Sequence, residues 1–187
     1  MTKLATVYIL SGPAGVGKST TANALAKALP SSSLISGDVV SWMHKNGREK
    51  PWLSEKEVAL IWDNILSIAK NFLARDIDVV IDYVTFPKQA EWFAKSVQSF
   101  NCEVRYVVFM CDAQTLIERD RQRAPAYQMG NRCLELSKEF KTASTNPQHI
   151  FDTTNLNPDD LPYILYNIKK NEQYKIHNGV TAYVHKN

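Results

Sequence analysis

Residues 4–29, with the sequence LATVYILSGPAGVGKSTTANALAKAL, are the part of this chain that says most about its fold. An apolar run at residues 4–10 is followed by the pattern Gly12-x-x-x-x-Gly17-Lys18-Ser19 and then by a segment rich in Ala and Leu. This order of strand, glycine-rich loop and helix is typical of a phosphate-binding loop. Glycines let consecutive backbone N–H groups turn toward an anion, and the positive end of the helix dipole faces the same anion. The stretch therefore predicts a nucleoside triphosphate site, without distinguishing ATP from GTP.

The parts of this loop have separate expected contacts with the nucleotide. Lys18 can reach the β- and γ-phosphates and stabilise the transferred charge, and the Ser19 hydroxyl can bind Mg²⁺. We therefore expect ATP and Mg²⁺ as cofactors. The residues predicted to bind the phosphates are Gly12, Ala14, Gly15, Val16, Gly17, Lys18, Ser19 and Thr20. The alternative, a glycine-rich turn without a ligand, is disfavoured by the complete motif in its strand-and-helix context.

The composition is that of an ordinary globular chain. Its 187 residues suffice for one well-buried core and are few for two, so we predict a single domain over residues 1–187. A net charge of +3 is too small to indicate nucleic acid or a membrane as a partner. Three cysteines without metal-like spacing, and the lack of a long apolar run, predict a reduced cytoplasmic protein. Monomer and homodimer stay open.

Apolar strand-like runs alternate with helical patterns along the chain. The runs are residues 4–10, 33–35, 79–81, 104–110 and 149–151. Such alternation predicts an α/β fold with a five-stranded parallel sheet and helices on both faces. In such folds ligands bind at the carboxyl ends of the strands. An Asn178-Gly179 pair further predicts a small hairpin in the tail.

Two aspartates directly follow predicted strands. Asp38 follows the second strand, where a carboxylate can orient an acceptor hydroxyl and take its proton. Asp82 ends the third strand in the manner of a Walker B carboxylate, beside the Mg²⁺ expected at Ser19. Asp38 could instead cap a helix that begins at Val39, and Asp82 could cap a turn. We predict a catalytic role for Asp38 and a metal or acceptor contact for Asp82.

A long insertion separates the second and third strands. Residues 38–76 contain an aromatic and basic stretch and then a helix from Ser54 to about residue 74, opened by a capping box of Ser54 and Glu57. A second substrate could be held there. Trp42, Trp52 and Tyr83 are candidates for an acceptor pocket, although aromatic residues at such spacing are more often core or rim.

Three arginines within five residues form a further cluster. Arg119, Arg121 and Arg123 carry forked donors suited to phosphate oxygens, and nearby Pro125 and Gly130 suit a mobile flap. We predict an arginine-rich lid over residues 119–131 that closes on the nucleotide, with Asp120 facing outward. The alternative is a solvated helix face.

Together these features resemble the small-molecule and nucleotide kinases of the P-loop superfamily, a group that includes shikimate kinase, gluconate kinase, chloramphenicol phosphotransferase and polynucleotide kinase. The resemblance extends to residue 174. It rests on residues 12–19, Ser36-Gly37-Asp38, Val80-Ile81-Asp82, Arg119-x-Arg121-x-Arg123 and Phe151-Asp152-Thr153-Thr154-Asn155. The resemblance implies that Asp38 contacts the acceptor hydroxyl, that Arg119 stacks on adenine, and that Arg123 contacts phosphate and takes part in catalysis. It also implies that Thr153 and Asn155 border the adenine.

The acceptor is less well defined than the reaction. The glycine-rich turn of shikimate kinases is replaced by Asp82-Tyr83-Val84-Thr85, and the Asp-x-Thr-Asn signature of polynucleotide kinases lacks its Asn. We expect an ATP-dependent phosphotransferase acting on a small hydroxylated molecule. The alternatives are a nucleic-acid 5′-hydroxyl kinase, which needs a basic groove beside Asp38, and a nucleotide-binding switch ATPase without an acceptor.

Overall fold

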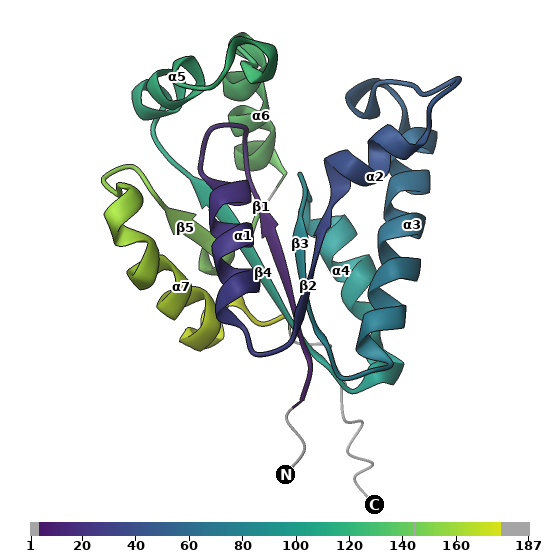
Figure 1. The fold of residues 1–187 in the computed structure, drawn as a ribbon. Coiled ribbons are helices and arrows are strands. Elements are labelled where there is room, and N and C mark those ends of the chain that lie inside the picture. Colours follow the sequence, from purple (N-terminus) through teal and green to yellow (C-terminus); the bar gives the residue numbers. More distant parts are fainter. Residues whose placement is uncertain (1–3, 144, 177–187) are drawn as a thin grey trace, which may run out of the picture.

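A five-stranded parallel sheet forms the centre of the protein (Figure 1). The computed structural model describes residues 4–143 and 145–176. The strands are β1 (Thr6–Ser11), β2 (Ser32–Ser36), β3 (Asp78–Asp82), β4 (Glu103–Met110) and β5 (Ile150–Asp152). They lie in the order β2-β3-β1-β4-β5. The predicted α/β class and the five predicted strands are confirmed, with strand ends that differ by at most two residues.

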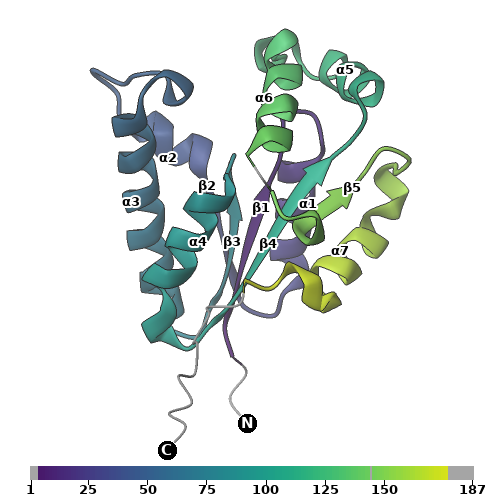
Figure 2. The ribbon, with the colours of Figure 1, turned by 180° about the vertical axis from the view of Figure 1, so that it is seen from behind.

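Helices cover both faces of this sheet, as the alternating pattern predicts (Figures 1 and 2). They are α1 (Lys18–Ala28), α2 (Gly37–Met43), α3 (Glu55–Leu73), α4 (Pro87–Ser96), α5 (Ala113–Arg121), α6 (Asn131–Thr142) and α7 (Leu161–Lys170). Within residues 4–143 and 145–176, no helix has the length and apolar character needed to cross a membrane. The predicted hairpin at Asn178 and Gly179 lies outside the described residues.

Side-chain alternation along the strands divides the core into two layers. In β1, Val7 and Ile9 are fully buried in the cluster that includes α3, α4 and part of α6. The intervening Tyr8 and Leu10 are buried against α1 and α7 on the opposite face. A strand buried on both faces reads as a continuous apolar run, which explains why residues 4–10 lack polar alternation.

The strand register brings the sequence-predicted site together at one edge of the sheet. Ser36 at the end of β2 pairs with Asp82 at the end of β3, and Asp82 is also in register with Leu10 of β1. The loop after β1, the start of α2 and the end of β3 therefore meet at this edge, which lies at the top of Figure 1. Parallel sheets bind ligands at this edge.

The long helix α3 within the insertion confirms the sequence prediction, but its capping box forms only in part. The Ser54 hydroxyl accepts a hydrogen bond from the Glu57 backbone N–H at 3.2 Å. The Glu57 carboxylate does not return to the cap. It is buried and lies 3.0 Å from Nδ1 of His44, which follows α2. This pair ties α2 to α3, so a tertiary contact has replaced a local one.

A buried hydrogen-bond cluster fixes the loop between β3 and α4. The Ser11 hydroxyl donates to the Thr85 carbonyl at 2.8 Å and accepts from the Thr85 N–H at 2.8 Å. The Tyr106 hydroxyl donates to the same carbonyl at 2.6 Å. All three residues are buried. The cluster holds the segment that carries Tyr83 and Phe86 against the end of β1.

We expect Ser11→Ala to lower the free energy of unfolding by about 1–3 kcal/mol, because it leaves the buried Thr85 N–H without its acceptor. The matched control is Ser67→Ala on α3, where the hydroxyl donates to the Asp63 carbonyl in an exposed position. Urea denaturation of both variants measures the difference. Equal losses in the two variants would contradict the assigned role of the cluster.

Candidate functional site

The loop between β1 and α1 has the backbone that a phosphate-binding loop requires. Gly12, Gly15 and Gly17 have φ angles of 127°, 89° and 94°, in the region that side chains disfavour. A Cβ on Gly12 would also lie 2.2 Å from the Phe109 carbonyl oxygen of β4. The loop therefore needs glycine at this position for both conformation and space.

Lys18 is held against the loop at the first turn of α1. Its Nζ donates a hydrogen bond to the Pro13 carbonyl at 2.7 Å. Desolvation lowers the pKa of Lys18 to about 8, although the carboxylates of Asp82 and Asp38 act in the opposite direction. The ammonium group is thus incompletely compensated by the protein. A phosphate group at the loop would supply the missing negative charge.

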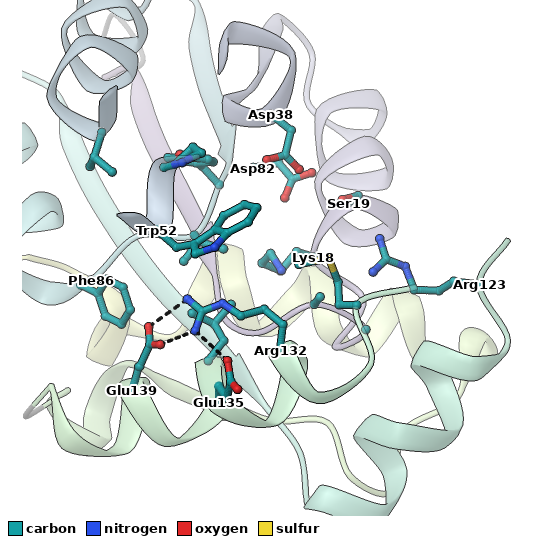
Figure 3. A pocket seen from close by; sticks show the side chains of 18 of the residues that line it. Lys18, Ser19, Asp38, Trp52, Asp82, Phe86, Arg123, Arg132, Glu135 and Glu139 are labelled. Carbon is teal, nitrogen blue, oxygen red and sulfur yellow. Dashed lines mark hydrogen bonds and ion pairs between the residues drawn. The ribbon is translucent and has the colours of Figure 1, made fainter. Parts of the chain in front are cut away.

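The Ser19 hydroxyl and the Asp82 carboxylate face each other at the end of β3. Burial raises the pKa of Asp82, while the hydrogen bond with the Ser19 side chain and the charge of Lys18 lower it. The nearby Asp38 carboxylate raises it further, and Figure 3 shows the two carboxylates close together. Such oxygen donors suit Mg²⁺.

The described residues contain no group of three or more His, Cys, Asp or Glu side chains that could hold a metal by themselves. Mg²⁺ at this position would therefore also need ligands from the nucleotide or from water. This fits the usual behaviour of Mg²⁺, which is bound by one or two protein groups together with phosphates and waters.

Asp38 lies in the first turn of α2 and lines the cavity. The helix begins at Gly37, and the Ser36 hydroxyl accepts a long hydrogen bond of 3.4 Å from the Val39 N–H. The helix cap is therefore Ser36, and the alternative assignment of Asp38 as the cap is wrong. The Asp38 side chain is exposed toward the cavity and is available for other contacts.

Gly37 has a role that the sequence analysis did not identify. A Cβ at this position would lie 2.2 Å from Cγ of Tyr83. The Tyr83 ring thus packs directly on the backbone before Asp38. Burial raises the pKa of Tyr83, and the Asp38 carboxylate raises it further. Close packing of β3 against the start of α2 places Asp38 beside Asp82.

One cavity of about 990 Å³ extends from the phosphate-binding loop. At one end, the predicted residues that line it are Ala14, Gly15, Gly17, Lys18, Ser19, Thr20, Asp38, Asp82, Arg119 and Arg123. Gly12, Val16, Thr153 and Asn155 do not line it. Val16 and Thr153 are buried, and Asn155 is exposed. The nucleotide contacts of these four residues stay predictions.

Arg119 connects α5 to the loop after β5. Its guanidinium donates to the Thr153 hydroxyl at 3.1 Å, to the Thr153 carbonyl at 2.8 Å and to the Leu156 carbonyl at 2.7 Å. It lines the cavity together with Arg123, whereas Arg121 is exposed and does not. Adenine stacking by Arg119 and lid closure over residues 119–131 stay predictions.

Asp120 was expected to face outward, and this prediction is wrong. Its side chain is 4% exposed and accepts hydrogen bonds from the backbone N–H groups of Met129, at 3.0 Å, and Gly130, at 2.8 Å. Arg123 also contacts it at 3.4 Å. The N–H groups before α6 need an acceptor, and Asp120 supplies it from α5. A pattern of charges along the sequence could not reveal this long-range contact.

The other end of the cavity is lined by two of the three aromatic candidates and by three charged residues that were not predicted. Of the three candidates, Trp52 and Tyr83 line the cavity. Trp42 is 62% exposed and packs against Arg48, whose guanidinium carbon lies 4.4 Å from the Trp42 ring centre. The charged residues Arg132, Glu135 and Glu139 of α6 also line the cavity and were not predicted. Their helical spacing could have indicated a common face, but not its direction.

We expect Asp120→Asn to lower the free energy of unfolding by about 1–3 kcal/mol. The substitution removes the charged carboxylate that accepts hydrogen bonds from two backbone N–H groups. The amide hydrogens of Met129 and Gly130 should then exchange faster. The matched control is Asp159→Asn at an exposed position. Hydrogen exchange and thermal unfolding measure these effects. Unchanged protection at both amides would contradict the role given to Asp120.

Comparisons with known proteins agree with this geometry. By sequence, no curated protein matches the chain. A solved sugar kinase structure from Janibacter sp. HTCC2649 superimposes with a TM-score of 0.65 at 11% identity, over 89% of this chain and 95% of that chain. A gluconokinase from Sinorhizobium meliloti 1021 gives a TM-score of 0.61 at 16% identity, over 89% and 90%. A chain of the Pnkp1/Rnl/Hen1 RNA repair complex gives a TM-score of 0.52 at 16% identity, over 76% of this chain and 47% of that chain.

At these identities the structural comparisons show a shared fold, which is the P-loop kinase-like α/β fold predicted from the phosphate-binding loop and the alternating strand and helix patterns. A family model described as an AAA domain matches residues 7–139, which is more than half of the chain. The matched range contains the phosphate-binding loop, both aspartates and most of α6. The chain therefore belongs to the AAA domain family of P-loop proteins.

Proposed function

We propose that the protein is an ATP-dependent, Mg²⁺-requiring phosphotransferase that moves the γ-phosphoryl group to a hydroxyl of a small molecule. The observation that carries this proposal is the position of Asp38. Its carboxylate lies beside Asp82 and Ser19 and lines a cavity that continues well beyond the phosphate-binding loop. A hydrolase needs space only for water, whereas this cavity leaves space for a second substrate.

The residues at the loop end would act mainly by position and charge. Lys18 and the loop N–H groups would stabilise negative charge on the transferred phosphoryl group, and Ser19 with Asp82 would hold the metal. Mg²⁺, when bound, neutralises charge on the phosphate oxygens. Asp38 would accept the proton of the acceptor hydroxyl and orient its oxygen toward phosphorus. Arg123, which also lines the cavity, would contact the phosphates.

The charge around the cavity favours a small acceptor over a nucleic-acid strand. Of the basic residues in the insertion, Arg48 lines the cavity, while Lys45 and Lys50 do not. The Lys50 ammonium instead lies 5.7 Å from the ring centre of Trp52. A strand with several phosphates needs a continuous series of cations. These positions do not provide one beside Asp38.

We expect Asp38→Asn to lower kcat for the best acceptor by about 10²–10⁴-fold, because general-base assistance is lost while the side-chain volume is kept. ADP release with Mg-ATP is measured against sugars, sugar acids, shikimate, nucleosides, aminoglycosides and short 5′-hydroxyl oligonucleotides. Asp159→Asn is the control. If no acceptor raises turnover above background hydrolysis, and Asp38→Asn equals wild type, the proposed function is wrong.

A second prediction concerns pH. With its pKa at about 8, Lys18 loses its proton as pH rises above that value, and nucleotide binding must then restore the proton. We expect the affinity for Mg-ATP to fall by roughly 25-fold between pH 7.5 and pH 9.5, with proton uptake on binding. Calorimetry in buffers of different ionisation enthalpy measures both quantities.

Two variants test whether Lys18, and not another lysine, causes the pH dependence of Mg-ATP binding. Lys18→Met should bind Mg-ATP weakly and show little pH dependence in this range. Lys27→Met, in an exposed position of the same helix, should retain the wild-type profile. A pH dependence that persists in Lys18→Met would assign the titration to another group.

A further inference from the structure

The end of the cavity remote from the phosphate-binding loop has a mostly apolar and aromatic wall. It forms where η1 (Pro51–Leu53), α3, the loop after β3 and α6 meet. The apolar part of the wall includes Trp52, Leu53, Val58, Tyr83, Phe86 and Leu136. Surfaces of this kind favour ligands with apolar frameworks, because burial of apolar area is favourable. An apolar surface offers no hydrogen bonds to the polar groups of a ligand.

Parts of this wall are supported by the protein core. The Phe86 ring stacks on the buried Phe140 ring, with ring centres 4.6 Å apart and an interplanar angle of 28°. The Tyr83 ring meets the buried Trp62 ring edge-on, with ring centres 6.1 Å apart. Aromatic groups fixed in this way present a preformed surface to a ligand.

The charged groups at this end balance one another. Among the described residues that line it, the arginines are Arg48 and Arg132, and the carboxylates are Glu135 and Glu139. Arg132 donates to both carboxyl oxygens of Glu139 and to Glu135 at 3.4 Å, as Figure 3 shows. The positive charge of Arg132 is therefore already neutralised within the wall.

Arg48 is also engaged by the protein. Its Nε donates to the carbonyl and hydroxyl oxygens of Ser41 at 3.1 and 2.9 Å, and its guanidinium packs on Trp42. An acceptor with a carboxylate or phosphate would have to displace Glu139 from Arg132, and at Arg48 it would find the Nε already engaged by Ser41. A polyol would place several of its hydroxyl groups against the apolar part of the wall, where they would lose hydrogen bonds to water.

We propose that the acceptor is an uncharged molecule whose hydroxyl is carried on a flat, largely apolar framework, such as an aromatic ring. The framework would lie between Trp52 and Phe86, and the Arg132–Glu139 pair would exclude anionic molecules. This inference rests on the proposed function, because it takes Asp38 as the group that the acceptor hydroxyl meets.

Two matched probes test the acceptor class. They are 1-phenylpropane-1,3-diol and 3-hydroxy-3-phenylpropanoate, which share the ring and the secondary hydroxyl and differ in a terminal hydroxymethyl or carboxylate group. Binding of each to the full chain saturated with Mg²⁺ and a non-hydrolysable ATP analogue is measured by calorimetry. We expect the diol to bind at least about tenfold more tightly, because the carboxylate must break an existing ion pair.

Variants connect this preference to the residues of the wall. Glu139→Gln should release Arg132 and reduce the preference for the diol by about tenfold, whereas the exposed Glu91→Gln should not change it. Trp52→Ala should weaken binding of both probes about tenfold, and Tyr166→Ala, exposed on α7, should have no effect. Equal or tighter binding of the acid, an unchanged preference in Glu139→Gln, or no binding of either probe would overturn the proposal.

Assays of phosphoryl transfer distinguish a failure of this inference from a failure of the proposed function. If gluconate or shikimate is phosphorylated while the diol does not bind, the acceptor class is wrong and the kinase function stands. If the diol binds with the expected preference but neither the diol nor any acceptor from the panel receives phosphate, the binding class is supported and the kinase function is wrong.

Discussion

The desolvated ammonium group of Lys18 is the constraint on which the site depends. The chain places it against the glycine-rich loop and near the carboxylates of Asp38 and Asp82. The end of the cavity beside the phosphate-binding loop therefore holds positively and negatively charged groups close together, in surroundings with reduced access to water. Such an arrangement is stabilised when phosphate and a divalent cation complete it, because each ion compensates the opposite charge already present. The local electrostatics thus favour a metal-bound nucleotide over either ion alone.

The fold provides this arrangement through strand register and close packing. Asp82 is in register with the end of β2, and Gly37 allows the Tyr83 ring to pack against the start of α2. The buried Ser11–Thr85 contact then fixes the loop that follows β3. Two sides of the cavity are therefore set by the same strand, one beside the phosphate-binding loop and one at the aromatic wall. Changes in β3 should affect both ends of the site together.

Local sequence patterns predicted the sheet, the phosphate-binding loop and the two aspartates, because each depends on neighbouring residues and on where strands end. Contacts across the fold were not predictable in this way. Asp120 looked like part of a solvated charge run, yet it satisfies N–H groups nine or ten residues later. Glu57 looked like a capping residue, yet it pairs with His44. Arg132 and its two glutamate partners can be recognised as cavity residues only once the position of α6 beside the cavity is known.

The central claim is that the γ-phosphoryl group passes to a hydroxyl rather than to water. The most direct test is ³¹P NMR of Mg-ATP incubated with the protein and mixed hydroxylated acceptors, which distinguishes a phosphomonoester of the acceptor from inorganic phosphate. We expect a phosphomonoester signal that grows together with ADP and depends on the acceptor. Inorganic phosphate as the sole product, formed at a rate that acceptors do not change, would contradict it and would favour a nucleotide-hydrolysing switch.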